Sequence, residues 1–578
     1  QSLTMPIYSR PLRSFCHALL CLPAIMVQAQ TGQAATPAQL DAREQQLQQQ
    51  RSAQQPQPDA PDVRLQPATT VPLQRYHRGE APCFVISDLR LQGDSAGRFQ
   101  WALAAADRDS SGREDILAGH CLDVAGINLV INRVQAAILA RGYITTRVLA
   151  GPQQLATGVL ALTLIPGRIR DIRYAQPAAE RLHAANALPM QAGDLLNLRD
   201  IEQGLENLKR VPTAEADIRI EPAAASDAAP GDSDLVIQWQ QANPYRFTLS
   251  ADDGGSKSTG LYQGSATLSY DHLFTLNDLF YFTHNHDLGA DGERGSEGYA
   301  WHYSIPFGYW LLAYSGSQHR YHQAVAGASQ TYRYSSKSES SELKLSRLVY
   351  RNAVRKLGLS LKGWQRGSSN FIDDTEIEVQ SRRTAGWEVG ANWREFIGSA
   401  TLDVNLAYRR GTGARNAMPA PEEAFGEGRS RPRLYQADAQ LDAPFTVGGQ
   451  KLRYGLAWRA QWNRGPLVPQ DRFAIGSRYT VRGYNGENQL SAERGWLLRN
   501  ELGWQLAGQE LYLGYDYGRV AGPSASLLLG QRLAGATLGV RGRLGSLAYD
   551  AFISQPHGYP DYLRAARTTG GVSLNLQF

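Results

Sequence analysis

The pattern of hydrophobic and polar positions divides the chain near residue 243. Before that point, apolar residues recur at helical spacing in residues 124–141 and 198–208, with strand-like apolar runs on either side of both segments. After it, helical spacing ends, and short alternating segments are separated by turns rich in Gly, Asp and Ser. The first part therefore predicts α/β modules, and the second predicts a large all-β domain.

The part before residue 243 predicts two small modules with the same order of elements: strand, helix, strand, strand. The first module covers residues 83–166 and the second covers residues 167–242, as an approximate internal repeat. The predicted strands lie at 83–91, 143–149 and 159–165 in the first module, and at 169–174, 216–220 and 235–240 in the second.

The alternation after residue 243 predicts a transmembrane β-barrel. In residues 572–578 the even positions are apolar and the odd positions are polar, so one face suits lipid and the other a wet lumen. The 336 residues of 243–578 accommodate about 16 antiparallel strands with their turns, each long enough for the ~9–11 residues that cross a bilayer. This part holds 23 of the 27 Tyr and 9 of the 11 Trp, which suits aromatic girdles; an aromatic-rich soluble β domain is the alternative.

The first residues predict export. Two arginines precede the apolar stretch Phe15–Val27, which ends in the small-residue pattern Val27-Gln28-Ala29. These features predict a signal peptide within residues 1–29, starting at Met5 after an upstream remnant. A short anchor helix is the alternative, but the stretch has only 13 residues and contains Pro23. Beyond it no run of 18 apolar residues occurs, which argues against a helical membrane protein.

The cysteines predict a disulfide. Once the signal peptide is removed, Cys83 and Cys121 remain, and two cysteines in an exported protein most simply pair. On the chain-entropy model, closing this loop adds about 3–4 kcal/mol to the stability of its domain. No Cys-x-x-Cys spacing occurs, so we expect no structural zinc.

Residues 30–55 predict an isolated polar helix. The string Thr36-Pro37-Ala38-Gln39 has the form of a capping box with proline at the first helical position. Large apolar residues occur only at Leu40 and Leu47, so this helix must lie in water or in a polar cavity; a disordered Gln-rich tail is the alternative. Six prolines in residues 56–82 predict an extended linker of up to ~80 Å.

The composition and motifs favour neither a nucleic-acid partner nor an enzyme. A net charge of +5 is small for 578 residues, and no concentrated basic stripe stands out. No His-Glu-x-x-His pair or phosphate-binding loop is present, so we expect no cofactor and no catalytic residues. His284 and His286 lie two apart on a predicted strand and could start a metal site, but without a further ligand they are interpreted as polar residues that face the lumen.

Together these parts resemble the two-partner secretion transporters, also called the haemolysin-activator family, of the Omp85 superfamily. The strongest motif is Val481-Arg482-Gly483-Tyr484, which is similar to the family's signature loop tip and is preceded by Phe473-Ala474-Ile475-Gly476. The second is Tyr512-Leu513-Gly514-Tyr515-Asp516-Tyr517-Gly518. Supporting matches are Arg141-Gly142-Tyr143, Pro166-Gly167-Arg168-Ile169, Leu276-Asn277-Asp278 and the terminal Phe578, which looks like a barrel-assembly signal.

The resemblance implies a fold and a set of site residues. It implies a transmembrane β-barrel over residues 243–578, two periplasmic polypeptide-transport-associated (POTRA) modules and a plug helix in residues 30–55. It also implies that the loop tip folds back into the barrel, where Arg482 pairs with Asp516 on the inner wall. In that arrangement Gly483 permits the chain reversal, and Tyr484 packs against the wall. The family often has a cysteine pair in its first module, where Cys83 and Cys121 fall.

The function implied by the resemblance is secretion across the outer membrane of a Gram-negative bacterium. The partner would be a large, β-rich exoprotein of the TpsA type, such as a haemolysin, an adhesin or a contact-dependent growth inhibition toxin. It would add strands to the open sheet edges of the POTRA modules and cross without ATP. The outer membrane, its lipopolysaccharide and the barrel-assembly machinery are further expected partners. An outer-membrane assembly factor and a porin-like channel are the alternatives.

Overall fold

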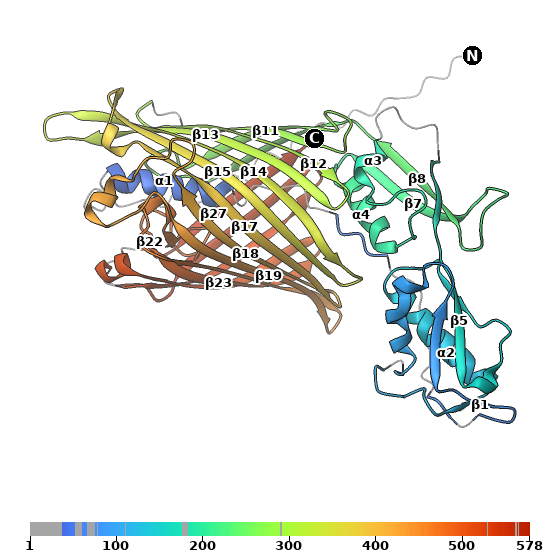
Figure 1. Ribbon diagram of the computed structural model, residues 1–578. Coiled ribbons are helices and arrows are strands. Elements are labelled where there is room, and N and C mark those ends of the chain that lie inside the picture. Colours follow the sequence, from blue (N-terminus) through green and yellow to red (C-terminus); the bar gives the residue numbers. More distant parts are fainter. Residues whose placement is uncertain are drawn as a thin grey trace, which may run out of the picture.

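In a computed structural model the chain forms a β-barrel with a helix inside it and two modules at one end (Figure 1). The structure describes residues 37–52, 61–65, 75–77, 79–109, 111–175, 183–289, 292–528, 530–560, 563 and 566–578. The predicted signal peptide lies outside these residues. No helix among them is long and apolar enough to cross a membrane.

The barrel confirms the predicted number of about 16 strands. All neighbours are antiparallel, and β27 pairs with β9 to close the ring. The two-residue β16 (Thr375–Glu376) only extends the outer end of β15. The strands are β9 (Tyr245–Asp252), β10 (Gln263–Asp271), β11 (Leu279–Asp287), β12 (Gly295–Phe307), β13 (Trp310–Ala326), β14 (Thr331–Arg351), β15 (Arg355–Ile372), β17 (Arg382–Ile397), β18 (Ala400–Thr412), β19 (Arg433–Val447), β20 (Gln450–Asn463), β23 (Arg494–Leu506), β24 (Gln509–Ala521), β25 (Arg532–Leu544), β26 (Leu547–Pro556) and β27 (Thr569–Gln577).

The alternation predicted for the last strand is confirmed. Val572 and Leu574 are 45% and 40% exposed on the outer face, whereas Ser573 and Asn575 line a cavity in the lumen. The longest strand, β14, has 21 residues, about twice the ~9–11 that cross a bilayer. If the predicted membrane location holds, the barrel wall extends beyond the bilayer next to β14.

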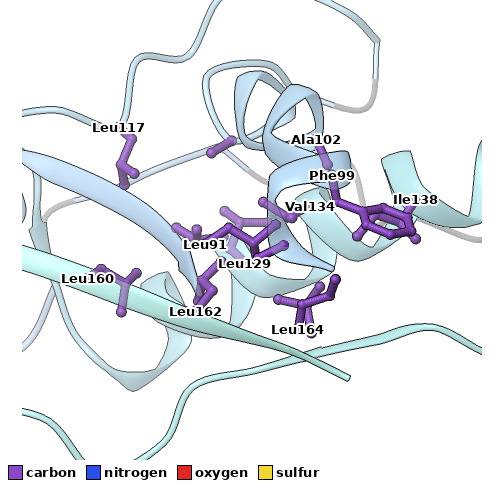
Figure 2. Close-up of a cluster of buried hydrophobic side chains, with 14 of the residues drawn as sticks. Leu91, Phe99, Ala102, Leu117, Leu129, Val134, Ile138, Leu160, Leu162 and Leu164 are labelled. Atoms are coloured by element: carbon purple, nitrogen blue, oxygen red, sulfur yellow. The ribbon is translucent and has the colours of Figure 1, made fainter. Parts of the chain in front are cut away.

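The first module packs a three-stranded sheet against α2 (Val124–Ala140), in the order β2-β5-β4. The helix and β5 agree with the prediction, but the predicted strand at 83–91 is split and the one at 143–149 is shorter. A 3-10 helix, η1 (Ala96–Ala105), was not predicted; its Phe99 and Ala102 complete the core shown in Figure 2. The strands are β1 (Phe84–Val85), β2 (Asp88–Gln92), β3 (Cys121–Leu122), β4 (Arg147–Leu149) and β5 (Val159–Ile165), and a short η2 covers Leu155–Thr157.

The predicted disulfide is present. Cys83 and Cys121 are bonded and close a loop with a sequence separation of 38 residues, which contains β2 and η1. We expect Cys83→Ser to lower the unfolding free energy of the first module by about 3–4 kcal/mol, because the open loop regains chain entropy. Denaturant unfolding followed by Trp101 fluorescence, with and without reductant, measures this. The variant should match the reduced wild type, and an unchanged midpoint would contradict the prediction.

The second module repeats the plan with the sheet order β6-β8-β7 and α4 (Leu198–Lys209) across it. All four predicted elements are present with boundaries shifted by a few residues. The apolar face of α4 packs Ile201, Leu205 and Leu208 into the core. The remaining elements are β6 (Ile169–Tyr174), β7 (Ala214–Pro222), β8 (Ser233–Gln241) and the short α3 (Ala184–Ala187).

Two of the supporting motifs lie where the modules join. Gly142 has a φ of +96°, and a Cβ there would lie 2.4 Å from Oδ1 of Asn197, the residue that caps α4. A Cβ on Gly167 would lie 1.9 Å from Oγ1 of Thr145. These glycines let the end of one module approach the first turn of the next, so the junction is closely packed.

Candidate functional site

A long loop at the end of the barrel opposite the modules folds back and carries the Arg482 motif. This segment, residues 464–493 between β20 and β23, is called the lumen loop. It contains a hairpin of β21 (Phe473–Ile475) and β22 (Leu490–Ala492) and a single turn, η5 (Pro469–Asp471). Its Ile475 and Val481 are fully buried against wall residues such as Val520. The lumen loop is therefore a folded part of the barrel interior.

Arg482 is the centre of the polar contacts that hold the lumen loop. The residue is 2% exposed, and its Nε and Nη2 each donate to Asp516 at 2.7 Å. Its backbone N–H donates to the same carboxylate at 3.0 Å. Asp516 lies on β24 and is 0% exposed. Because a bidentate pair fixes the direction of the guanidinium as well as its charge, this contact orients the loop tip on the wall.

The lumen face of β24 explains the spacing of the second motif. Its inward residues are Tyr512, Gly514, Asp516 and Gly518. A Cβ on Gly514 would lie 2.6 Å from Nη2 of Arg482, and one on Gly518 would lie 2.8 Å from Cγ2 of Val481. The two glycines therefore leave the space that the loop tip fills, and the aspartate between them supplies the opposite charge.

The other two residues of the loop tip contact β25 and β26. Gly483 has a φ of +101°, and a Cβ there would lie 2.8 Å from the carbonyl oxygen of Gln555, so this turn requires glycine. The Tyr484 hydroxyl donates to the carbonyl of Ala534 at 2.9 Å. All four motif residues thus lie against the wall.

A substitution at Gly535 on β25 tests how closely the lumen loop must approach the barrel wall. A Cβ on Gly535 would lie 1.8 Å from the backbone oxygen of Arg482. We expect Gly535→Ala to displace the loop tip, at a cost of about 1–3 kcal/mol or more, and to make the lumen loop sensitive to added protease. The control is Gly363→Ala on β15, where a Cβ would meet nothing within 4 Å. Equal cleavage of the two variants would contradict the prediction.

The other members of this charge cluster were not predicted from the sequence. Glu501 on β23 accepts from Arg482 at 2.5 Å and from Arg541 at 3.0 Å. Arg499, two residues earlier, lies 3.8 Å from Asp516. The alternation of β23 is a sequence signal for both residues, because Arg499 and Glu501 lie on the face opposite to the exposed Leu502 and Trp504. What the sequence does not contain is the register that brings β23 and β25 to the same loop tip.

The predicted polar helix is α1 (Pro37–Ser52), which lies inside the barrel (Figure 1). Arg43 donates to Ser258 of the loop between β9 and β10 at 2.7 Å and to Glu487 of the lumen loop at 2.8 Å. Further helix residues that hydrogen-bond to the loops or the wall are Asp41, Glu44, Gln46 and Gln50. The sequence analysis predicts that this polar helix lies in water or in a polar cavity. The barrel lumen is that cavity.

The two candidate histidines do not face the lumen. Asn285 lines the same lumen cavity as Arg482. Because side chains alternate along a strand, its neighbours His284 and His286 point outward, on the same face as Phe282, which is 38% exposed. The lumen-facing interpretation is therefore wrong. Within the described ranges no group of three or more His, Cys, Asp or Glu could hold a metal ion.

The string Gly93-Asp94-Ser95-Ala96-Gly97 has the spacing of a hydrolase nucleophile motif. In the structure Arg168 Nη2 donates to Asp94 at 2.7 Å and to the Ser95 hydroxyl at 3.0 Å. Arg168 belongs to the Pro166–Ile169 motif at the start of the second module. These contacts therefore link the two modules.

The second module is held against the near end of the barrel by the Leu276–Asp278 motif. Asn277 is 0% exposed, and its Nδ2 donates to the carbonyl of His183 at 2.7 Å and to Asn186 at 2.9 Å. On α4, burial raises the pKa of Asp200, and its hydrogen bond from Tyr309 partly offsets that rise. These contacts fix the module beside the barrel mouth.

The terminal Phe578 lies at the seam of the barrel. Its N–H donates to the carbonyl of Phe247 on β9 at 2.9 Å, and the two ring centroids are 6.2 Å apart. The residue is 67% exposed on the outer face. Its role as an assembly signal stays a prediction.

The comparison with protein families decides the identity of this architecture. The family model described as haemolysin secretion/activation protein ShlB/FhaC/HecB matches residues 231–542. The chain belongs to this family. A ShlB-type POTRA model matches residues 108–167, and a second POTRA model matches residues 168–222. The predicted fold class, a transmembrane β-barrel with two POTRA modules and an N-terminal helix, is confirmed.

Individual members of the haemolysin secretion/activation family resemble the chain over nearly its full length. It is 38% identical to the outer membrane transporter CdiB-2 of Burkholderia pseudomallei strain 1026b, over 97% of this chain and 98% of that protein. Solved structures of CdiB from Acinetobacter baumannii and from Escherichia coli superimpose with TM-scores of 0.80 and 0.81, at 30% and 25% identity. Each covers 95% of this chain and 100% of the solved chain. The protein is thus an outer-membrane protein of a transporter family, with its POTRA modules in the periplasm.

Proposed function

We propose that this protein secretes one large, β-rich exoprotein of the contact-dependent growth inhibition class through its barrel. The observation that carries this proposal is a polar helix held inside a 16-strand barrel that has two POTRA modules at its periplasmic end. The 38% identity to a transporter named CdiB-2 favours this client class over a haemolysin or an adhesin.

At rest, α1 occupies the lumen and acts as the plug. Its polar contacts are hydrogen bonds and ion pairs, such as Arg43 with Glu487 at 2.8 Å. Water can replace such contacts when the helix leaves, so departure costs far less than opening a hydrophobic core. The Arg482–Asp516 pair holds the lumen loop in place beside the plug, and the loop forms part of the wall along which the client moves.

The POTRA modules bind the unfolded client. The open edge strands are β2 and β4 in the first module and β6 and β7 in the second. An extended client segment can add to such an edge through main-chain hydrogen bonds, which need no cofactor. Folding of the client outside the cell prevents backsliding and supplies the driving force. We further propose that the barrel-assembly machinery recognises the last strand with Phe578, and that lipopolysaccharide surrounds the outer end of the barrel.

Export from a Gram-negative host tests the proposed function. Cells that produce this protein together with a contact-dependent inhibition exoprotein should display that exoprotein on their surface, whereas cells without the transporter should retain it in the periplasm. A porin-like channel would leave the exoprotein inside. An assembly factor would change the level of other barrel proteins without exporting it.

A further inference from the structure

The linker between the plug and the first module is bound to the protein at residues 61–65. The side chains of Val63 and Leu65 pack against the core of the second module. The N–H of Val63 donates to Glu206 at 2.9 Å, and the N–H of Leu65 donates to Glu202 at 2.7 Å. Both acceptors lie on α4. The linker segment is therefore held against the second module through every second residue, Val63 and Leu65.

The periplasmic ends of three barrel strands contact the other side of the same segment. Asp62 pairs with Lys356 of β15 at 2.6 Å and with Arg394 of β17 at 2.7 Å. Arg351 of β14 donates to the carbonyl of Val63 at 2.6 Å. The guanidinium of Arg64 lies 4.1 Å from the ring centroid of Phe396. We call this surface the linker site; its residues are Glu202, Glu206, Arg351, Lys356, Arg394 and Phe396.

The linker site has the features of a site that binds an extended peptide. The side chains of Arg351 and Glu202 are 3% and 1% exposed, and they pair with each other at 2.9 Å. Glu206 and Glu202 accept from the N–H groups of Val63 and Leu65. Arg351 and Arg199 donate to the carbonyls of the same two residues, at 2.6 Å and 3.4 Å. The side chains of Val63 and Leu65 fill apolar positions at a spacing of two. Main-chain hydrogen bonds combined with alternate side-chain positions are the general mode by which proteins bind extended peptides.

The position of the linker site determines how far the plug can move. With residues 61–65 bound, only the eight residues 53–60 connect α1 to the site, and they span at most about 26–29 Å. The helix itself is about 24 Å long, so its tethered end at Ser52 stays within about one helix length of the barrel mouth even when α1 is out of the lumen. With the site empty, the next fixed point is Arg75, which pairs with Asp109 of the first module next to the buried Tyr76, and the connection grows to the 22 residues 53–74.

We propose that the linker site is a latch that holds the plug near the lumen, and that the plug moves clear of the barrel mouth only when this site is emptied. This inference rests on the plug role proposed above. Because α4 and the barrel strands form the site together, movement of the second module away from the barrel opens it. Client binding to that module is thereby coupled to plug release. For a flexible chain, lengthening the tether from eight to 22 residues lowers the effective concentration of the plug about fivefold.

Single-channel recording on residues 30–578 tests the latch. Asp62→Arg should raise the open probability about fivefold, because it places a cation against Lys356 and Arg394. The control is Asp217→Arg on β7 of the second module, where the side chain is 59% exposed; it should behave as the wild type. An open probability for Asp62→Arg equal to that of the control would overturn the proposal.

A peptide competitor tests the latch on the wild-type protein, so the result does not depend on whether a variant folds. A synthetic peptide of residues 56–70, added to the periplasmic side of the wild type, should raise the open probability, and the same peptide with Asp62 replaced by Lys should not. Equal effects of the two peptides, or no effect of either, would contradict the latch. Deletion of residues 37–52 separates the two proposals. If the deletion opens the pore but the latch tests fail, the latch alone is wrong, and if the deletion changes nothing, the plug is wrong as well.

Discussion

Deletion of residues 37–52 is expected to raise the mean conductance of the protein several-fold in planar bilayers. These residues form α1, and a helix with its side chains is about 10–12 Å across, a large share of the lumen of a 16-strand barrel. Because the helix is held by polar contacts, its removal leaves a hydrated lumen and does not open the hydrophobic cores of the modules.

Arg43→Ala provides an intermediate case for the same measurement. It removes the contacts to Ser258 and Glu487 but leaves the helix in the chain, so we expect brief openings rather than a steady pore. Gel mobility with and without heating checks that each variant has a folded barrel. A folded deletion variant that conducts no better than the wild type would show that α1 does not close the pore.

Arg482→Ala is expected to release the lumen loop and abolish export. The change leaves Asp516 buried without its bidentate partner, and breaking a buried pair from one side costs about 3–5 kcal/mol. Arg482→Lys keeps the charge but loses the planar fork, so it should retain part of the function. The measurement is the rate at which a thiol reagent labels a cysteine at Ser477, which is 1% exposed in the folded loop.

The matched control for this variant is Arg519→Ala, since Arg519 lies on the same strand but is exposed on the outer face. Labelling should be fast in Arg482→Ala, slower in Arg482→Lys, and as slow as the wild type in the control. Labelling of Arg482→Ala at the wild-type rate would contradict the role of the pair in holding the loop.

The elements that periodicity specifies strongly could be predicted, and those that depend on irregular packing could not. The helix at 124–141 and the alternation at 572–578 agree with the structure because each has a single clear period. The 3-10 helix η1 was missed because it packs through a few side chains without such a period. The split of the strand at 83–91 likewise depends on β1 pairing with β3 beside the disulfide.

The residues of the candidate site also fall into some that the sequence predicts and others that depend on how the strands pack. The contact of Arg482 with Asp516 followed from a resemblance together with the inward position of Asp516, whereas Glu501 and Arg541 join it only through strand register. Strand alternation predicts that the side chains of residues 284–286 alternate between two faces, but it does not show which face lines the lumen. The prediction that the two histidines face the lumen was therefore wrong. The linker site depends on how α4 sits against the barrel, and prolines in the linker predict only an extended chain.

We propose that the exoprotein crosses the lumen that α1 occupies at rest. Cysteines in place of Arg43 and Ser258, whose side chains are in contact at 2.7 Å, can be joined by a thiol-cleavable bismaleimide to hold the plug inside the barrel. We predict that cells with the joined pair retain the exoprotein in the periplasm and that reductant restores its surface display, while either single-cysteine variant exports throughout. Export that continues at the wild-type rate with the plug joined would contradict passage of the exoprotein through this lumen.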